Sequence, residues 1–224
     1  MIHEARSLAR LRIAFLLESN SVTGGTRSTL ALAEGLLKIG HRVTVFTHFR
    51  QARYFPYRIL LQEVSSFEKV LRFGFDLAVL TNVTQIPELV GRLQTPLLWF
   101  VQGYEGFLRA RRPEELVVDR VPSVRDVYRI PISKVVYSES LRSFLLEHFG
   151  PPVSWIPPGL DRIWFSYRPI ARKKGPRRIM VLGPARWPLK GTDHAFHAFQ
   201  ILKKKIPNFM VVYVSSQEEE PRSF

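Results

Sequence analysis

The chain has 224 residues and no cysteine, and its 33 lysines and arginines outnumber 19 aspartates and glutamates to give a formal net charge of +14. At roughly 100–200 residues per domain, this length fits one large domain, or one domain and part of another. The missing cysteines exclude a disulfide framework, a thiolate zinc site and a cysteine nucleophile, and the 46% hydrophobic content argues against a disordered chain. The surplus positive charge indicates an anionic partner: nucleic acid, an anionic membrane surface or a phosphate-bearing ligand.

Short apolar runs alternate with helical patterns through the N-terminal half. Residues 12–17 and 41–47 predict strands, because nearly all-apolar runs suit strands buried on both faces of a parallel sheet. Residues 26–39 between them have helical spacing and stop at Gly40. Further expected strands are 76–80, 97–101, 135–137 and 153–156, and further expected helices are 66–73 and 138–149. This alternation predicts an α/β fold built on a Rossmann-like, doubly wound parallel sheet.

A second unit follows the break at Pro157, Pro158 and Gly159. The basic stretch RPIARKKGPRR (168–178) precedes an expected strand, helix and strand at 178–182, 192–205 and 209–214. We therefore expect residues 1–165 to form a complete domain, 166–178 a basic linker and 179–224 an incomplete second Rossmann-like unit, because too few residues remain for a full sheet.

The two expected units begin in a similar way. A strand opening at Arg12 leads to Gly25-Thr26, and a strand opening at Arg178 leads to Gly191-Thr192 at the same interval. One interpretation is two independent turns of common residue types. The other is two Rossmann-like domains, each beginning with its own anion-binding turn.

The first candidate site is the glycine pair Gly24 and Gly25, followed by Thr26. Glycine lets the backbone approach a ligand closely, and the start of the next helix offers free N–H groups to a phosphate. The spacing differs from the GxGxxG dinucleotide fingerprint. A tight turn without a ligand is the alternative interpretation.

Two more candidate sites follow expected strands. Arg186 and Lys190 lie just before an expected helix. Cations at this position can neutralise a diphosphate leaving group. The alternative interpretation is that both are solvated loop residues. Gln102 and Glu105 follow the strand 97–101, at the strand end where ligands of α/β sheets gather. Their amide and carboxylate groups can bind sugar hydroxyls. The alternative interpretation is that both are ordinary polar residues on the surface. The six histidines are spread over different segments, so we expect no metal site.

Five blocks, taken in order, resemble segments of glycosyltransferase family 4, whose members are retaining, nucleotide-sugar-dependent enzymes with two Rossmann-like domains (the GT-B fold). The blocks are RIAFLLESNSVTGGTRSTLALAEGLLKIGHRVTVFTH (12–48), FDLAVLTN (75–82), KVVYSESLRSFLLEHFG (134–150), WIPPGLDRIWF (155–165) and RIMVLGPARWPLKGTDHAFHAFQILKKKIPNFMVVYV (178–214). Their order and spacing carry the resemblance, which covers most of the chain.

The resemblance implies roles for two of the candidate sites. Gly24, Gly25 and Thr26 would approach the donor diphosphate, while Arg186 and Lys190 would stabilise the leaving group in place of a metal ion. No cofactor is implied beyond the nucleotide-sugar substrate.

Four departures from the family pattern stand out. Many members carry histidine where Gln102 stands, Pro158 replaces a usual asparagine, and Arg186 lies further from Gly183 than in the common Gly-Arg pair. The chain also ends before the family's two spaced glutamates, so we expect weak or absent turnover of this chain alone.

Two functional hypotheses result. The first is a hexosyltransferase-type enzyme that transfers sugar from a nucleotide donor to a carbohydrate or lipid-linked acceptor. The second is a non-catalytic binding or assembly subunit with the same fold, acting as a homodimer or with a complementing chain. Nucleic acid is not an expected partner, because the sequence has no stacking motif or recognition helix. No apolar run is long enough to span a bilayer, and we expect a cytoplasmic protein. The inner face of a membrane is a candidate surface to which it would bind peripherally.

Overall fold

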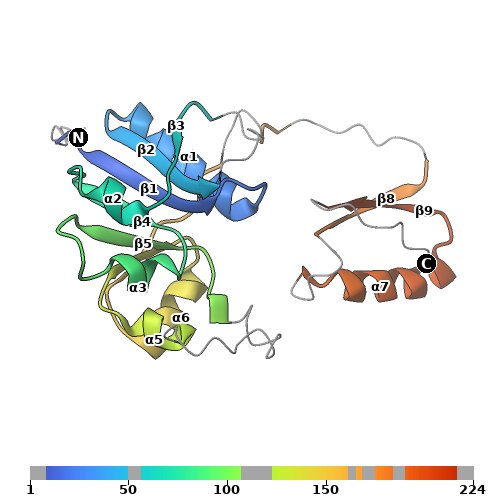
Figure 1. Ribbon diagram of the computed structural model, residues 1–224. Coiled ribbons are helices and arrows are strands. Elements are labelled where there is room, and N and C mark those ends of the chain that lie inside the picture. Colours follow the sequence, from blue (N-terminus) through green and yellow to red (C-terminus); the bar gives the residue numbers. More distant parts are fainter. Residues whose placement is uncertain are drawn as a thin grey trace, which may run out of the picture. The chain divides into compact units, whose positions relative to one another are not determined.

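The computed structural model describes residues 9–49, 57–106, 123–160, 165–167, 175–183 and 190–215. The chain divides into two units, Met1–Gly159 and Leu160–Phe224 (Figure 1). Among the described helices, none combines the length and the apolar character that crossing a bilayer requires.

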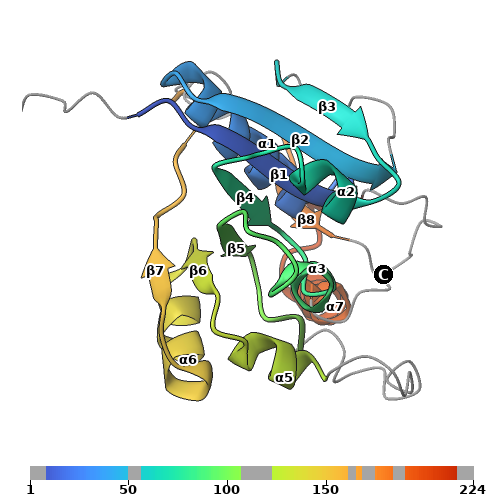
Figure 2. The same cartoon turned by 60° about the vertical axis from the view of Figure 1, so that its left-hand side comes forward.

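The first unit is built on a seven-stranded, wholly parallel sheet with the order β3-β2-β1-β4-β5-β6-β7. Figure 2 shows β3 and β7 at its two ends. The strands are β1 (Arg12–Ser19), β2 (Arg42–Phe49), β3 (Leu60–Glu63), β4 (Leu77–Leu80), β5 (Leu97–Val101), β6 (Ser133–Val136) and β7 (Val153–Trp155). Its helices are α1 (Gly24–Lys38), α2 (Phe67–Leu71), α3 (Gln85–Leu89), α5 (Val124–Arg129) and α6 (Glu139–Phe149). The expected Rossmann-like parallel sheet is confirmed.

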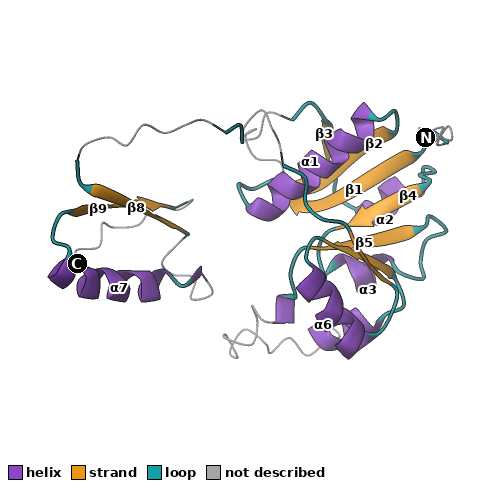
Figure 3. Cartoon of the chain, turned by 180° about the vertical axis from the view of Figure 1, so that it is seen from behind, coloured by secondary structure: helices purple, strands orange, loops and turns teal. Residues whose placement is uncertain are grey.

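The helices cover both faces of this sheet. Successive side chains of a strand point to opposite faces, so Ala14 and Leu16 pack on one side of β1 and Phe15 on the other. The first face carries the buried cluster to which α2, α3, α5 and α6 contribute. The second face packs against α1, which Figure 3 shows lying along β1 and β2. Burial on both faces explains why the strands are continuous apolar runs.

Local capping explains where the longer helices begin and end. The Thr23 side chain accepts a hydrogen bond from the Thr26 amide, so α1 begins at Gly24, two residues before the expected start. Ser138 caps α6 in the same way, and Gly150, with a φ of 75°, ends it as expected.

Three short elements of the first unit were not expected from the sequence: β3, α3 and α5. The strand β3 has 4 residues at the edge of the sheet, and α3 has 5 residues with Pro87 among them. The two helices contain less than two turns each and the strand only two cycles of alternation, so their periodicity is hard to detect.

The second unit contains β8 (Arg177–Leu182), α7 (Thr192–Lys205) and β9 (Phe209–Val214), close to the expected elements, and its two strands are parallel. The helix α7 covers one face, where Phe196 and Phe199 contact rings of β9. The opposite face carries exposed apolar side chains beside Arg178, and we call this apolar part the open β8–β9 face. It consists of Met180, Leu182, Met210, Val212 and Val214, which are between 39% and 69% exposed.

Candidate functional site

The strand order reverses between β1 and β4, and in α/β sheets ligands bind at the carboxyl ends of the strands beside such a reversal. The predicted residues Gly24, Gly25 and Thr26 form the first turn of α1, just beyond the carboxyl end of β1. The Thr26 amide is bonded to Thr23 Oγ1 at 3.0 Å. The amides of Gly24 and Gly25, as the first two of the helix, have no acceptor within it. The glycine pair therefore supplies the amides suited to an anion.

The structure brings this turn together with another predicted residue, Gln102, which follows β5. A Cβ atom added to Gly25 would lie 3.0 Å from Gln102 Oε1, whereas one added to Gly24 would meet nothing within 4 Å. Gln102 Nε2 donates to Thr29 Oγ1 at 3.0 Å, and Thr29 is fully buried in α1. The end of β5 is thus fixed against the first turns of α1, and Gly25 makes room for that contact.

Glu105, the other predicted residue after β5, is held by a tyrosine that the sequence did not single out. The Tyr128 hydroxyl donates to a Glu105 carboxylate oxygen and lies 3.1 Å from the Gly103 carbonyl oxygen. Burial, together with the negative charge of Glu105, raises the pKa of Tyr128. The phenol therefore stays protonated and holds the Glu105 carboxylate beyond the end of β5.

Aromatic packing holds Tyr128 rigidly in place. Its fully buried ring lies 4.3 Å from Trp99, 4.9 Å from Tyr104 and 5.3 Å from Phe149, measured between ring centroids. These three rings come from β5, from the segment after it and from α6. A side chain surrounded in this way has little rotamer freedom, so the position of Glu105 is set by the core.

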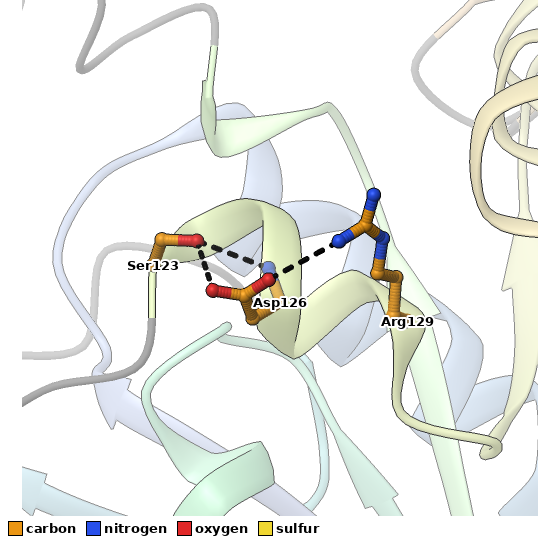
Figure 4. Close-up of polar contacts among 3 residues, drawn as sticks. All are labelled: Ser123, Asp126 and Arg129. Carbon is orange, nitrogen blue, oxygen red and sulfur yellow. Dashed lines mark hydrogen bonds and ion pairs between the residues drawn. The ribbon is translucent and has the colours of Figure 1, made fainter.

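The helix α5, which carries Tyr128, has a start signal that the sequence did display. Ser123 Oγ accepts the Asp126 amide at 3.2 Å and lies 2.6 Å from Asp126 Oδ2, while Arg129 Nη1 lies 3.4 Å from Asp126 Oδ1 (Figure 4). A serine followed three residues later by an acidic side chain is typical of a helix N-terminus. This pattern is the signal by which α5 could have been found in the sequence, although nothing local in it identifies Tyr128 as a partner of Glu105.

The chain after α5 is anchored by a buried lysine. Lys134 of β6 is 2% exposed, and its Nζ donates to the carbonyl oxygens of Ile130 and Ile132 at 3.2 and 3.3 Å. Its ammonium lies 5.8 Å from the centroid of the Trp99 ring, and burial lowers the pKa of Lys134. This lysine supports the aromatic packing around Tyr128.

A further carboxylate, which the sequence reasoning missed, lies where the strand order reverses. Glu18 of β1 is half-buried, and its Oε1 accepts hydrogen bonds from Gln85 Nε2 at 2.8 Å and Thr84 Oγ1 at 3.3 Å. Gln85 is fully buried and its Oε1 accepts from the Thr81 amide at 2.9 Å. These contacts tie the end of β1 to the segment after β4.

In the second unit the structure describes one of the two predicted cations. Arg186 lies outside the described residues. Lys190 is exposed and immediately precedes Gly191, the N-cap of α7. Gly183, at the end of β8, has a φ of 127°, and a Cβ added there would lie 3.0 Å from Lys190 Cβ. The stem of Lys190 is therefore packed against the end of β8, one residue before the N-cap of α7.

Within the described ranges, no group of three or more histidine, aspartate or glutamate side chains is arranged to hold a metal ion.

Comparison with protein-family models and with curated proteins finds no match. Among solved structures, an α-glucosyltransferase in complex with UDP and a DNA containing an HMU base matches 93% of this chain and 58% of its own, with a TM-score of 0.60 and 12% identity. HepE of Anabaena, in complex with UDP and glucose, matches 93% of this chain and 70% of its own, with a TM-score of 0.61 and 13% identity. WaaG, a glycosyltransferase involved in lipopolysaccharide biosynthesis, matches 92% of this chain and 70% of its own, with a TM-score of 0.61 and 14% identity.

These likenesses define the class of fold. The chain has the Rossmann-like α/β fold of GT-B glycosyltransferases, and it spans 58–70% of the length of the three structures.

Proposed function

We propose that this protein is a nucleotide-sugar-dependent, retaining glycosyltransferase of the hexosyltransferase type. The observation that carries the proposal is the contact between the first turn of α1 and Gln102 after β5, which joins two predicted ligand-binding segments at one edge of the sheet. The fold supports the proposal, since two of the similar structures hold UDP and one of these also holds glucose.

In this proposal the two units bind different substrates. Residues 1–165 form the acceptor side, 166–178 a basic linker and 179–224 the donor side. Gln102 and Glu105 bind acceptor hydroxyls, because an amide and a carboxylate both accept hydrogen bonds from sugar O–H groups. The Tyr128 contact keeps the Glu105 carboxylate in one position while it does so.

The chemistry assigned to the cations follows from charge development. When the bond between the donor sugar and the diphosphate breaks, negative charge grows on the phosphate oxygens. Lys190 and Arg186, on the donor side, stabilise that charge. Fixed cations of this kind take the role that a divalent ion has in other transferases.

The experiment is equilibrium binding of nucleoside diphosphates and their sugars to the 224-residue chain, measured by calorimetry. We expect at least one to bind, and Lys190→Met to weaken it about tenfold, which corresponds to about 1.4 kcal/mol. Lys204→Met is the matched control, because it removes the same charge at the other end of α7. Absence of binding across the panel, or equal affinity of the Lys190→Met variant, would contradict the proposal.

The open β8–β9 face favours a second candidate function, a non-catalytic assembly subunit that pairs with another copy or a complementing chain. Parallel sheets are ordinarily buried on both faces, whereas α7 covers one face here. Sedimentation of the purified chain tests this candidate: a stable, strictly monomeric species would count against it.

The net charge of +14 adds a proposal about location. A basic protein is attracted to anionic lipid, so a peripheral position on an anionic membrane would bring it to a lipid-linked acceptor. We expect the protein to pellet with anionic vesicles but not with neutral ones, and salt to weaken this binding. Equal pelleting with both kinds of vesicle would contradict the proposal.

A further inference from the structure

Thr192 carries an unpaired hydroxyl at the start of α7. Among the side chains that the structure describes, two buried polar atoms have no hydrogen-bond partner, Trp99 Nε1 and Thr192 Oγ1. Thr192 is 2% exposed. An unpaired buried hydroxyl is unfavourable, so its presence at this position calls for a partner.

The surroundings of this hydroxyl suit an anion. Thr192 is the first residue of a 14-residue helix whose N-cap, Gly191, has no side chain to bond the first amides. The first amides of a helix have no acceptor within it and carry its positive dipole end. Helical Cα–Cβ bonds tilt toward the N-terminus, so the Thr192 side chain leans to the end where those amides lie.

Two charged residues of opposite sign, Lys190 and Asp193, lie near the start of α7. Lys190 precedes the helix, and its stem is packed against Gly183. Asp193, the second helical residue, is acidic but exposed, so solvent screens its carboxylate.

The similar sequence at the start of α1 shows what a paired threonine looks like. Thr26 also follows a glycine, but its amide and hydroxyl both lie 3.0 Å from Thr23 Oγ1. Thr192 has no such partner. The two segments therefore look alike in sequence, but they differ in the groups that they leave for a ligand.

We propose that the Thr192 hydroxyl donates a hydrogen bond to a phosphate oxygen of the bound nucleoside diphosphate, beside the α7 amides and Lys190. This inference rests on the proposed function and assigns a residue to its donor side. It makes Thr192 a binding residue for the leaving group, and its contact strengthens as negative charge grows on the diphosphate.

The test compares Thr192→Val, which replaces the hydroxyl by a methyl group of similar size, with Thr192→Ser, which keeps a hydroxyl. Calorimetry with the full 224-residue chain measures the Kd of UDP and of inorganic pyrophosphate, and thermal unfolding measures the melting midpoint without ligand. Thr192→Ala is a second variant without the hydroxyl, in case valine disturbs folding. Lys190→Met reports on the proposed function separately.

We expect Thr192→Val to raise the Kd of both ligands about tenfold, as the loss of a hydrogen bond to a charged group would do. The Kd values of Thr192→Ser should stay within about threefold of those of the parent chain. The midpoint of the free Thr192→Val chain should stay the same or rise, because an unpaired hydroxyl is removed. If Lys190→Met weakens UDP but Thr192→Val and Thr192→Ala do not, this inference is wrong and the proposed function stands. If neither pyrophosphate nor any nucleoside diphosphate of the panel binds the parent chain, both fail together.

Discussion

Tyr128 shows how one buried residue can hold a candidate site. Its hydroxyl bonds Glu105 and lies near the Gly103 carbonyl, while its ring is fixed between Trp99 and Phe149. Lys134 of β6 is a second buried polar residue, and its ammonium donates hydrogen bonds to backbone carbonyl oxygens rather than to a carboxylate. Both groups are far costlier to leave unpaired inside the core than at the surface.

We expect Tyr128→Phe to lower the free energy of unfolding by about 1–3 kcal/mol at pH 7, because Glu105 loses a buried donor. The raised pKa of Tyr128 also predicts a pH dependence. Tyrosine in the unfolded chain loses its proton near pH 10, whereas the folded phenol keeps it. Above that pH the unfolded state binds fewer protons, so stability falls as pH rises.

The phenylalanine variant lacks this titration and should lose less stability between pH 9 and 11, as measured by urea unfolding with circular dichroism. Tyr167→Phe is the control, because that side chain is 91% exposed. Parallel pH profiles for the parent and Tyr128→Phe would show that this phenol does not titrate in the way proposed.

At the scale of elements, the start of α1 combines a helix cap with a close contact to the sheet. Gly24 and Gly25 are adjacent helical residues that differ in what surrounds them: open space at Gly24, and the Gln102 amide at Gly25. Their substitution by alanine therefore separates helix propensity from the contact with β5.

We expect Gly24→Ala to raise the free energy of unfolding by about 0.5–1 kcal/mol, because alanine is the better helix former. The free energy of unfolding of the Gly25→Ala variant should be about 1 kcal/mol lower than that of Gly24→Ala. The reason is that the new methyl group displaces the Gln102 side chain and breaks its hydrogen bond to Thr29. Chemical denaturation measures both. In a Gln102→Ala background the two variants should become equal, and a persisting difference would contradict this account.

At the scale of the whole molecule, the two units differ in how fully their sheets are covered. The seven-stranded sheet has buried clusters on both faces, whereas the second unit leaves the open β8–β9 face to solvent. Exposed apolar patches of this kind promote association.

We expect the chain to self-associate at high concentration, and Met180→Lys to reduce that association by at least threefold, because a charge in the middle of an apolar contact must be desolvated. Ile201→Lys is the control, as an exposed apolar residue on α7 with 61% exposure. Sedimentation velocity over a concentration series makes the comparison. Equal effects of the two substitutions would show that the open β8–β9 face is not the contact.

Local patterns in the sequence were sufficient for most of the fold. Apolar runs located the central strands, and Gly40, Ser138 and Gly150 marked helix ends, because periodicity, caps and stops act over a few residues. The same reasoning picked out Gly24, Gly25 and Gln102 as residues near strand ends. It missed β3, α3 and α5, which are too short to show a period.

Only the tertiary structure decided which of these residues meet. Gln102 bonds Thr29 from 73 positions away, and Glu105 meets Tyr128 across 23 positions. Such contacts depend on how α1 and α5 pack against the sheet, a property that no local pattern contains.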